Sequence, residues 1–147
     1  MTDKKKKKSA DADASQAADS PPKTYLTDEQ LEFFKDLLLK KRSAAMEEIR
    51  EMEERLEDAH DNAAGYTYHM ADSGSDAHER EKLTMFIGRQ QKYIGYLDRA
   101  LERIKYKTYG ICKHTGEPIP IERLKAVPHT DQTTEAKINA KRRHPKA

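Results

Sequence analysis

Apolar side chains recur every three or four residues along a first long stretch of the chain. Thr27 is a good helix N-cap, and Gln30 three residues later completes a capping box. Leu26 and Leu31 form a hydrophobic staple around this cap. The apolar positions that follow are Leu31, Phe34, Leu38, Ala45, Ile49, Met52, Leu56, Ala59 and Ala63. Their spacing predicts a long helix with a coiled-coil seam, which Gly65 can end in the left-handed conformation.

A second stretch has the same period. Its seam positions are Leu83, Ile87, Gln90, Ile94, Leu97, Leu101 and Ile104. Only Gln90 interrupts their apolar character. Two seams of equal period, joined by a short segment, predict an antiparallel helical hairpin. Arms of about 30 residues would extend roughly 45 Å at 1.5 Å per residue, a length suited to reaching into another molecule.

The segment near residues 65–78 is predicted to form the tip of this hairpin. Asp72 and Asp76 flank a Ser-Gly-Ser sequence there, and such carboxylates can approach a metal ion or a basic wall in a partner. Asp76 also has a structural explanation, because with Glu79 it can form a capping box for the second helix. Paired carboxylates can perform acid–base catalysis, but no nucleophile, base or pocket accompanies these two. We therefore do not expect this protein to be an enzyme.

Composition and charge favour narrow helix seams over a broad core. Charged residues make up 37% of the chain, hydrophobic ones 35%, and there is no tryptophan. The formal net charge is +2, so no overall field attracts nucleic acid or anionic lipid. Residues 1–23 join a lysine run to polar residues and two prolines, which predicts a disordered tail.

The cysteine count and the lack of apolar runs indicate a cytoplasmic protein without a membrane anchor. Cys112 is the only cysteine, so the chain cannot form an intrachain disulfide. No apolar stretch follows Lys4 to Lys8, as a secretory signal would require. No stretch approaches the roughly 20 apolar residues that span a bilayer.

Residues 108–130 are expected to form a small knob, and residues 131–147 a C-terminal helix and tail, with Thr130 or Asp131 as the helix cap. From Tyr109 the chain reads Tyr-Gly-Ile-Cys-x-x-Thr-Gly-x-x-Ile, and from Glu122 it reads Glu-Arg-Leu-x-Ala-x-Pro. These motifs closely resemble the zinc-finger segment of the DksA/TraR family. The preceding hairpin with its acidic tip lies at the family's position, so the resemblance covers about residues 25–140.

The resemblance implies a bacterial transcription regulator connected with the stringent response. In that family the hairpin enters the secondary channel of RNA polymerase, and tip aspartates act near the catalytic magnesium. The family tip reads Asp-x-x-Asp-x-Ala, whereas here Asp72 and Asp76 are separated by three residues and Ala77 follows directly. We assign Asp72, Asp76 and Ala77 to the partner-binding tip, with a detailed effect that the altered spacing leaves open.

The finger segment departs from the family pattern at its metal ligands. The family holds zinc with two Cys-x-x-Cys pairs, but here only the first position is a cysteine. The four positions are Cys112, Thr115, Thr133 and Ala136. Because a structural zinc site needs four good ligands, we expect neither zinc nor another metal. The finger would instead depend on apolar packing and on hydroxyl hydrogen bonds from the two threonines.

Guanosine tetraphosphate is a known partner in the family, bound by basic residues at the junction with polymerase. Two of the matching positions here are Tyr96 and Val127, which cannot pair with phosphate, and the third is Lys137. The resemblance therefore leaves this nucleotide open as a co-regulator.

The sequence thus predicts an all-α monomer: a long antiparallel coiled-coil hairpin over residues 24–107, a zinc-finger-like knob without zinc, and a C-terminal helix. Its expected function is to bind RNA polymerase and alter promoter complexes. Two alternatives remain at this point. One is nucleic-acid binding through the basic termini, residues 1–8 and 141–147. The other is a structural homodimer in which Gln90 would set the register of a four-helix bundle.

Overall fold

The computed structural model describes residues 23–65 and 70–144, with the backbone alone for residues 60–65 and 70–76. This part of the chain contains four helices: α1 (Asp28–Gly65), α2 (Met70–Lys105), α3 (Ile121–Ala126) and α4 (Thr134–Arg143). Within these described ranges there is no β-strand, and a single β-bridge joins Ile111 to Pro118. The predicted all-α fold is confirmed.

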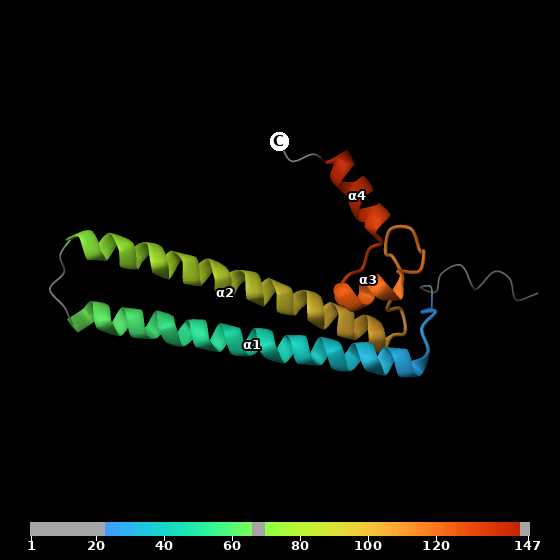
Figure 1. Ribbon diagram of the computed structural model, residues 1–147, viewed down its shortest axis with the longest axis horizontal. Helices are drawn as coiled ribbons and strands as arrows, with labels where there is room; N and C mark the ends of the chain where they lie inside the picture. The colour runs from blue at the N-terminus through green and yellow to red at the C-terminus, as the bar shows by residue number, and fades with distance from the viewer. Residues whose placement is uncertain (1–22, 66–69, 145–147) are drawn as a thin grey trace, which may run out of the picture.

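The first two helices form the predicted antiparallel hairpin, with the other two helices gathered beside one of its ends (Figure 1). At 38 and 36 residues they are longer than predicted and extend roughly 55 Å. The predicted capping box begins α1, because the amide of Gln30 donates to Thr27 Oγ1 at 3.2 Å and the amide of Thr27 donates to Gln30 Oε1 at 2.9 Å. None of the described helices is long and apolar enough to cross a membrane.

Two predicted helix caps are wrong. Asp76 does not cap the second helix, since α2 begins at Met70 and includes it. Gly and Ser lower helix propensity by at most about 1 kcal/mol each, which a helix of this length can offset through its seam. The cap of α4 is Thr133, whose side chain accepts the amide of Ala136 at 3.2 Å. Thr130 and Asp131 bond within the preceding loop instead, to Gln132 and to Lys113 respectively.

The hairpin seam is buried mainly at the end beside the knob. Leu38 and Leu97 are fully buried there. Toward the tip, the last buried positions among the described side chains are Ala45 on α1 and Ile87 on α2. Polar contacts also join the two helices, with Arg42 Nε bonded to Asp98 Oδ1 at 2.6 Å and Gln90 Nε2 bonded to Glu48 Oε2 at 2.6 Å.

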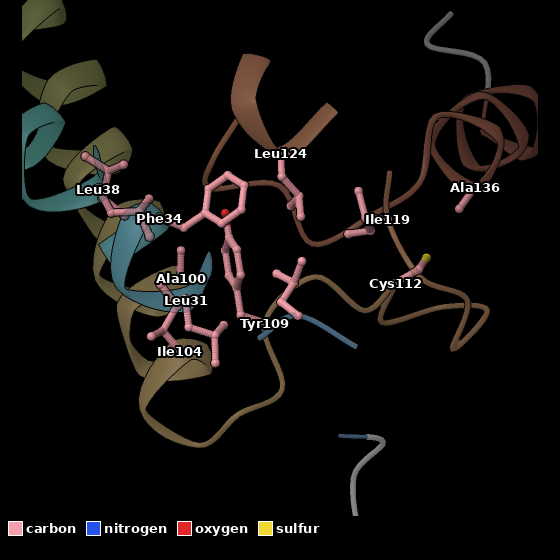
Figure 2. Close-up of a cluster of buried hydrophobic side chains, with 12 residues drawn as sticks. Leu31, Phe34, Leu38, Ala100, Ile104, Tyr109, Cys112, Ile119, Leu124 and Ala136 are labelled. Atoms are coloured by element: carbon pink, nitrogen blue, oxygen red, sulfur yellow. The ribbon is translucent and has the colours of Figure 1, made fainter. Parts of the chain in front are cut away.

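The knob packs against the first turns of α1 and the last turns of α2. Tyr109 is fully buried and lies against Phe34 of α1, with ring centroids 5.4 Å apart (Figure 2). Its hydroxyl donates to the carbonyl of Pro128 at 2.7 Å, so the buried polar atom is satisfied. The next residue, Gly110, has φ +83°, and a Cβ there would lie 3.2 Å from Leu26 Cδ1. The positive φ favours glycine at this turn, and a larger residue would also displace the side chain of Leu26.

Candidate functional site

The predicted tip residues lie at the end of the hairpin opposite the knob (Figure 1). Asp72 and Asp76 belong to the first two turns of α2, and their side chains lie outside the described residues. Ala77 is exposed. Positions four residues apart share one face of a helix, so the altered spacing still places both aspartate positions on one face. The segment that joins the helices, residues 66–69, lies outside the described residues.

The four degenerate zinc positions come together at the far side of the knob. The hydroxyl of Thr133 donates to Cys112 Sγ at 4.0 Å, and Thr115 lies close enough to this sulfur to lower the pKa of the thiol. Ala136 is buried and joins the same core cluster as Cys112, at one end of it (Figure 2). The fold of a finger is therefore kept around a single cysteine.

The side chains at these positions do not fit a zinc ion. Structural zinc is bound by four thiolate, imidazole or carboxylate ligands, whereas this set offers one thiol, two hydroxyls and a methyl group. His114 is exposed, and His129 packs against tyrosines of α2. Among the residues that the structure describes, no group of three or more His, Cys, Asp or Glu side chains is arranged to hold a metal. A hydrogen bond from Thr133 to Cys112 joins two of these positions directly.

Cys112 is buried in a polar environment. Burial raises the pKa of its thiol, but the hydroxyl of Thr115 and the backbone amides of Thr133, Thr115 and His114 donate to the sulfur and favour the thiolate. The net effect lowers the pKa to about 7. Cys112 is thus an acceptor around which donors of the finger are arranged.

A cleft of about 580 Å³ lies where the end of α2, the loop before α4 and the first turn of α4 meet. Its lining combines aromatic and basic side chains, and Asp131 is the acidic residue among them. It includes Tyr96, Val127 and Lys137, the three positions that the resemblance assigned to nucleotide binding. The full lining is Tyr96, Arg99, Arg103, Lys113, Arg123, Val127, His129, Thr130, Asp131, Gln132 and Lys137.

Most cations of the cleft are bound by the chain itself. Arg103 Nη2 donates to the carbonyls of His129 and Thr130, at 3.2 and 3.4 Å. Arg123 Nε donates to the carbonyl of Gln132 at 3.0 Å. Lys113 Nζ lies 2.9 Å from Asp131 Oδ2. These cations tie the loop to α2 and α3, so much of the cleft's positive charge is already neutralised or hydrogen-bonded.

His129 joins the loop to α2. Its ring stacks on Tyr96 and meets Tyr93 edge-on, with centroids 6.0 and 5.2 Å apart. Its Nδ1 is buried without a hydrogen-bond partner. Burial, followed by the nearby charges of Arg103 and Lys41, lowers the pKa of His129 below its usual 6.5. The imidazole is therefore neutral at pH 7.

One surface was missed by the sequence analysis. Between Lys82 and Arg103, α2 carries five basic and two acidic residues. One of the two acidic residues, Asp98, forms an ion pair with Arg42 of α1. Basic and aromatic side chains follow one stripe at helical spacing, and we call them the cationic face of α2. The face consists of Lys82, Phe86, Arg89, Tyr93 and Tyr96. These residues recur at steps of four and three along the sequence, but that spacing was used only to predict the apolar seam.

Comparison with known proteins gives a consistent result. Residues 107–137 match the family described as the prokaryotic dksA/traR C4-type zinc finger. The chain is 35% identical to the RNA polymerase-binding transcription factor DksA of Caulobacter vibrioides over 124 residues, 84% of each protein. It is 33% identical to general stress protein 16O of Bacillus subtilis, over 78% of this chain and 70% of that one. The solved structure of transcription factor DksA2 from Pseudomonas aeruginosa superimposes with a TM-score of 0.72 at 32% identity, over 81% of this chain and 88% of that one.

Proposed function

The chain belongs to the DksA family of RNA polymerase-binding transcription factors, and we propose that it acts by placing its hairpin tip in the secondary channel of RNA polymerase. The knob would remain outside the channel, because it adds a second layer beside the hairpin and widens that end (Figure 1). The negative tip would then lie near the catalytic magnesium. The alternatives of a nucleic-acid-binding protein and a structural homodimer receive no support from the relatives.

The observation that carries this proposal is the length of the two-helix hairpin relative to its body. A helix of 38 residues packed on one of 36 residues makes a probe of roughly 55 Å that is only two helices wide. Such a shape buries little surface and is poor for stability, so its length needs an explanation outside the chain. Entry into a narrow channel provides one.

The mechanism requires no chemistry by this chain. Carboxylates at Asp72 and Asp76 would add negative charge beside the metal of the partner, and the helices would fill space that the partner's moving parts need. Both effects would change the lifetime of promoter complexes. The cationic face of α2 would meet acidic groups along the channel entrance and set the depth of insertion.

A charge-neutral tip tests this mechanism. Asp72→Asn with Asp76→Asn is expected to keep its affinity for core polymerase but to lose the effect on promoter-complex lifetime. Glu32→Gln with Asp36→Asn is the matched control, because it removes the same charge from exposed positions at the knob end of α1, far from the tip. Binding should be competed by another secondary-channel factor. An unchanged transcriptional effect in the tip variant would contradict the mechanism.

We further propose that the cleft binds guanosine tetraphosphate weakly. Tyr96 and Val127 supply no charge at two of the three matching positions, and Lys137 is the remaining cation. Restoring charge with Tyr96→Lys and Val127→Arg is expected to tighten binding of the nucleotide to the complex with polymerase. Equal nucleotide affinity of both proteins in that complex would contradict this assignment.

A further inference from the structure

A groove of about 370 Å³ lies between the first turns of α1 and helix α3, at the end of the hairpin opposite the tip (Figure 1). Phe34, on one side of the groove, is buried and belongs to the core, whereas the neighbouring ring of Phe33 is 54% exposed. A large aromatic side chain left in water beside an apolar groove marks a candidate contact surface. The residues that line the groove are Glu29, Gln30, Phe33, Phe34, Ile121 and Lys125.

Each of the two helices contributes one apolar and one charged residue to this groove. On α1, Phe33 follows Glu29 by four residues, so the two share one face of the helix. On α3, Lys125 follows Ile121 by four residues and shares a face with it in the same way. Glu29 and Lys125 are exposed, and neither forms an ion pair with another residue that the structure describes. One wall therefore carries an acid, the other a base, and both carry apolar side chains.

We propose that this groove binds the same groove of a second copy of the chain, in a reversible dimer with two-fold symmetry. In such an interface every contact occurs twice with the roles of the two copies exchanged. Glu29 of each copy would pair with the partner's Lys125, and apolar side chains of the facing copy would cover Phe33. A surface with charges of one sign would repel its own copy, so the presence of both signs favours self-association.

Other occupants fit this groove less well. Residues 1–22 of the same chain contain no aromatic residue and no Leu, Ile or Val. Their apolar side chains are Met1, alanines and prolines, which bury little surface against an aromatic ring. An unrelated protein would have to present an acid and a base in the arrangement that a second copy already provides.

The dimer should be weak. A stable interface takes roughly 20–30 residues from each partner, whereas the groove is lined by six. Self-association should therefore depend on protein concentration and, because its ion pairs are exposed, on ionic strength. Both hairpins stay unpaired in such a dimer, which distinguishes it from a four-helix bundle with Gln90 in its seam. The dimer does not depend on the proposed function.

Charge reversal provides a test that only a second copy can satisfy. Glu29→Lys alone, or Lys125→Glu alone, would place like charges opposite each other at both contacts of the dimer. An equimolar mixture of the two variants would again pair opposite charges at both contacts. Sedimentation velocity of the full-length proteins at low ionic strength, over a range of concentrations, measures the dimer dissociation constant, and the melting temperature reports on folding. Glu57→Lys and Lys92→Glu, at exposed positions of the hairpin outside the groove, are the matched controls.

Each groove variant alone is expected to raise the dimer dissociation constant by at least about tenfold, and the mixture should restore it to within about threefold of the unaltered value. The control variants, alone or mixed, should dimerise like the unaltered chain. Phe33→Gln removes the exposed ring without changing charge and should also weaken the dimer at an unchanged melting temperature, which keeps the test valid if a charge reversal disturbs folding. An unaltered chain that is monomeric at all concentrations would overturn the inference. A dimer that survives either reversal would do the same, and so would a mixture that stays monomeric.

Discussion

Beside the knob, α1 and α2 share a continuous buried core with the finger, whereas beyond Ala45 and Ile87 no described side chain of either helix is buried. The difference follows from geometry. At the knob a third segment covers the seam, so Phe34 and Leu97 are enclosed on all sides. Farther along, two helices have only each other, and each seam residue keeps one edge in water. The body of the molecule and its probe therefore differ in stability although they share the same two helices.

The largest expected effect on stability comes from truncating one large side chain in each region. Phe34→Ala is expected to lower the free energy of unfolding by about 3–5 kcal/mol, because a ring that is 1% exposed leaves a cavity beside Tyr109. Leu56→Ala in the half-buried distal seam should cost less than about 2 kcal/mol. Chemical denaturation measures both. Equal losses would contradict a core concentrated at the knob.

The next test concerns the cap that holds α4 to the finger. Thr133→Ala removes the acceptor of the Ala136 amide and a donor to Cys112, and should cost about 1–2 kcal/mol. Thr133→Ser keeps the hydroxyl and should recover most of this loss. The free energy of unfolding separates the two variants. A serine variant as unstable as the alanine one would indicate that the methyl group of Thr133, and not its hydroxyl, supports the knob.

Acid should weaken the junction between the loop and α2. The pKa of His129 is lowered in the folded chain, so stability is full above pH 6.5 and falls as the pH drops through the folded value. His129→Phe keeps the aromatic packing, removes the unpartnered Nδ1 and should add about 1 kcal/mol near pH 7. Its melting temperature should depend less on pH between 7 and 5. His114→Gln, at an exposed position, should keep the original pH dependence.

The smallest expected effect is that of a metal chelator. Because Thr115, Thr133 and Ala136 supply no zinc ligand, EDTA should leave the melting temperature unchanged. Thr115→Cys with Thr133→Cys and Ala136→Cys should bind one zinc ion and become sensitive to EDTA. Metal analysis of the purified proteins provides an independent measurement. A chelator-dependent loss of stability in the unaltered chain would show that the finger needs a metal.

Periodicity and capping rules predicted the scaffold well because they depend on residues close together in the chain. The Thr27 capping box and the two seams follow from local spacing, and both are present. The start of α2 was misplaced because Ser73-Gly74-Ser75 resembles a turn, although a long helix tolerates such a sequence. Helix formation is cooperative, and this cooperativity outweighs the local preference of these three residues for a turn.

The knob was predicted less completely because its key contacts join residues far apart in the chain. Tyr109 was noted only as the first residue of the finger motif, yet its ring packs against Phe34 of α1 and its hydroxyl donates to the carbonyl of Pro128. His129 likewise makes its ring contacts with Tyr93 and Tyr96 of α2, which lie far from it in the chain. Hydroxyl hydrogen bonds from the two threonines were predicted for the finger, and the hydroxyl of Thr133 donates to Cys112 Sγ at 4.0 Å.

The uneven burial along the hairpin has a consequence for its motions on slow timescales. Amide hydrogens of α1 from Leu31 to Ala45 are bonded within a helix that packs on the shared core, so their protection should approach the global free energy of unfolding. Protection should decline residue by residue from Ala45 toward Asp58, where opening breaks few contacts. The distal end of the hairpin can thus change its local conformation while the end beside the knob stays folded.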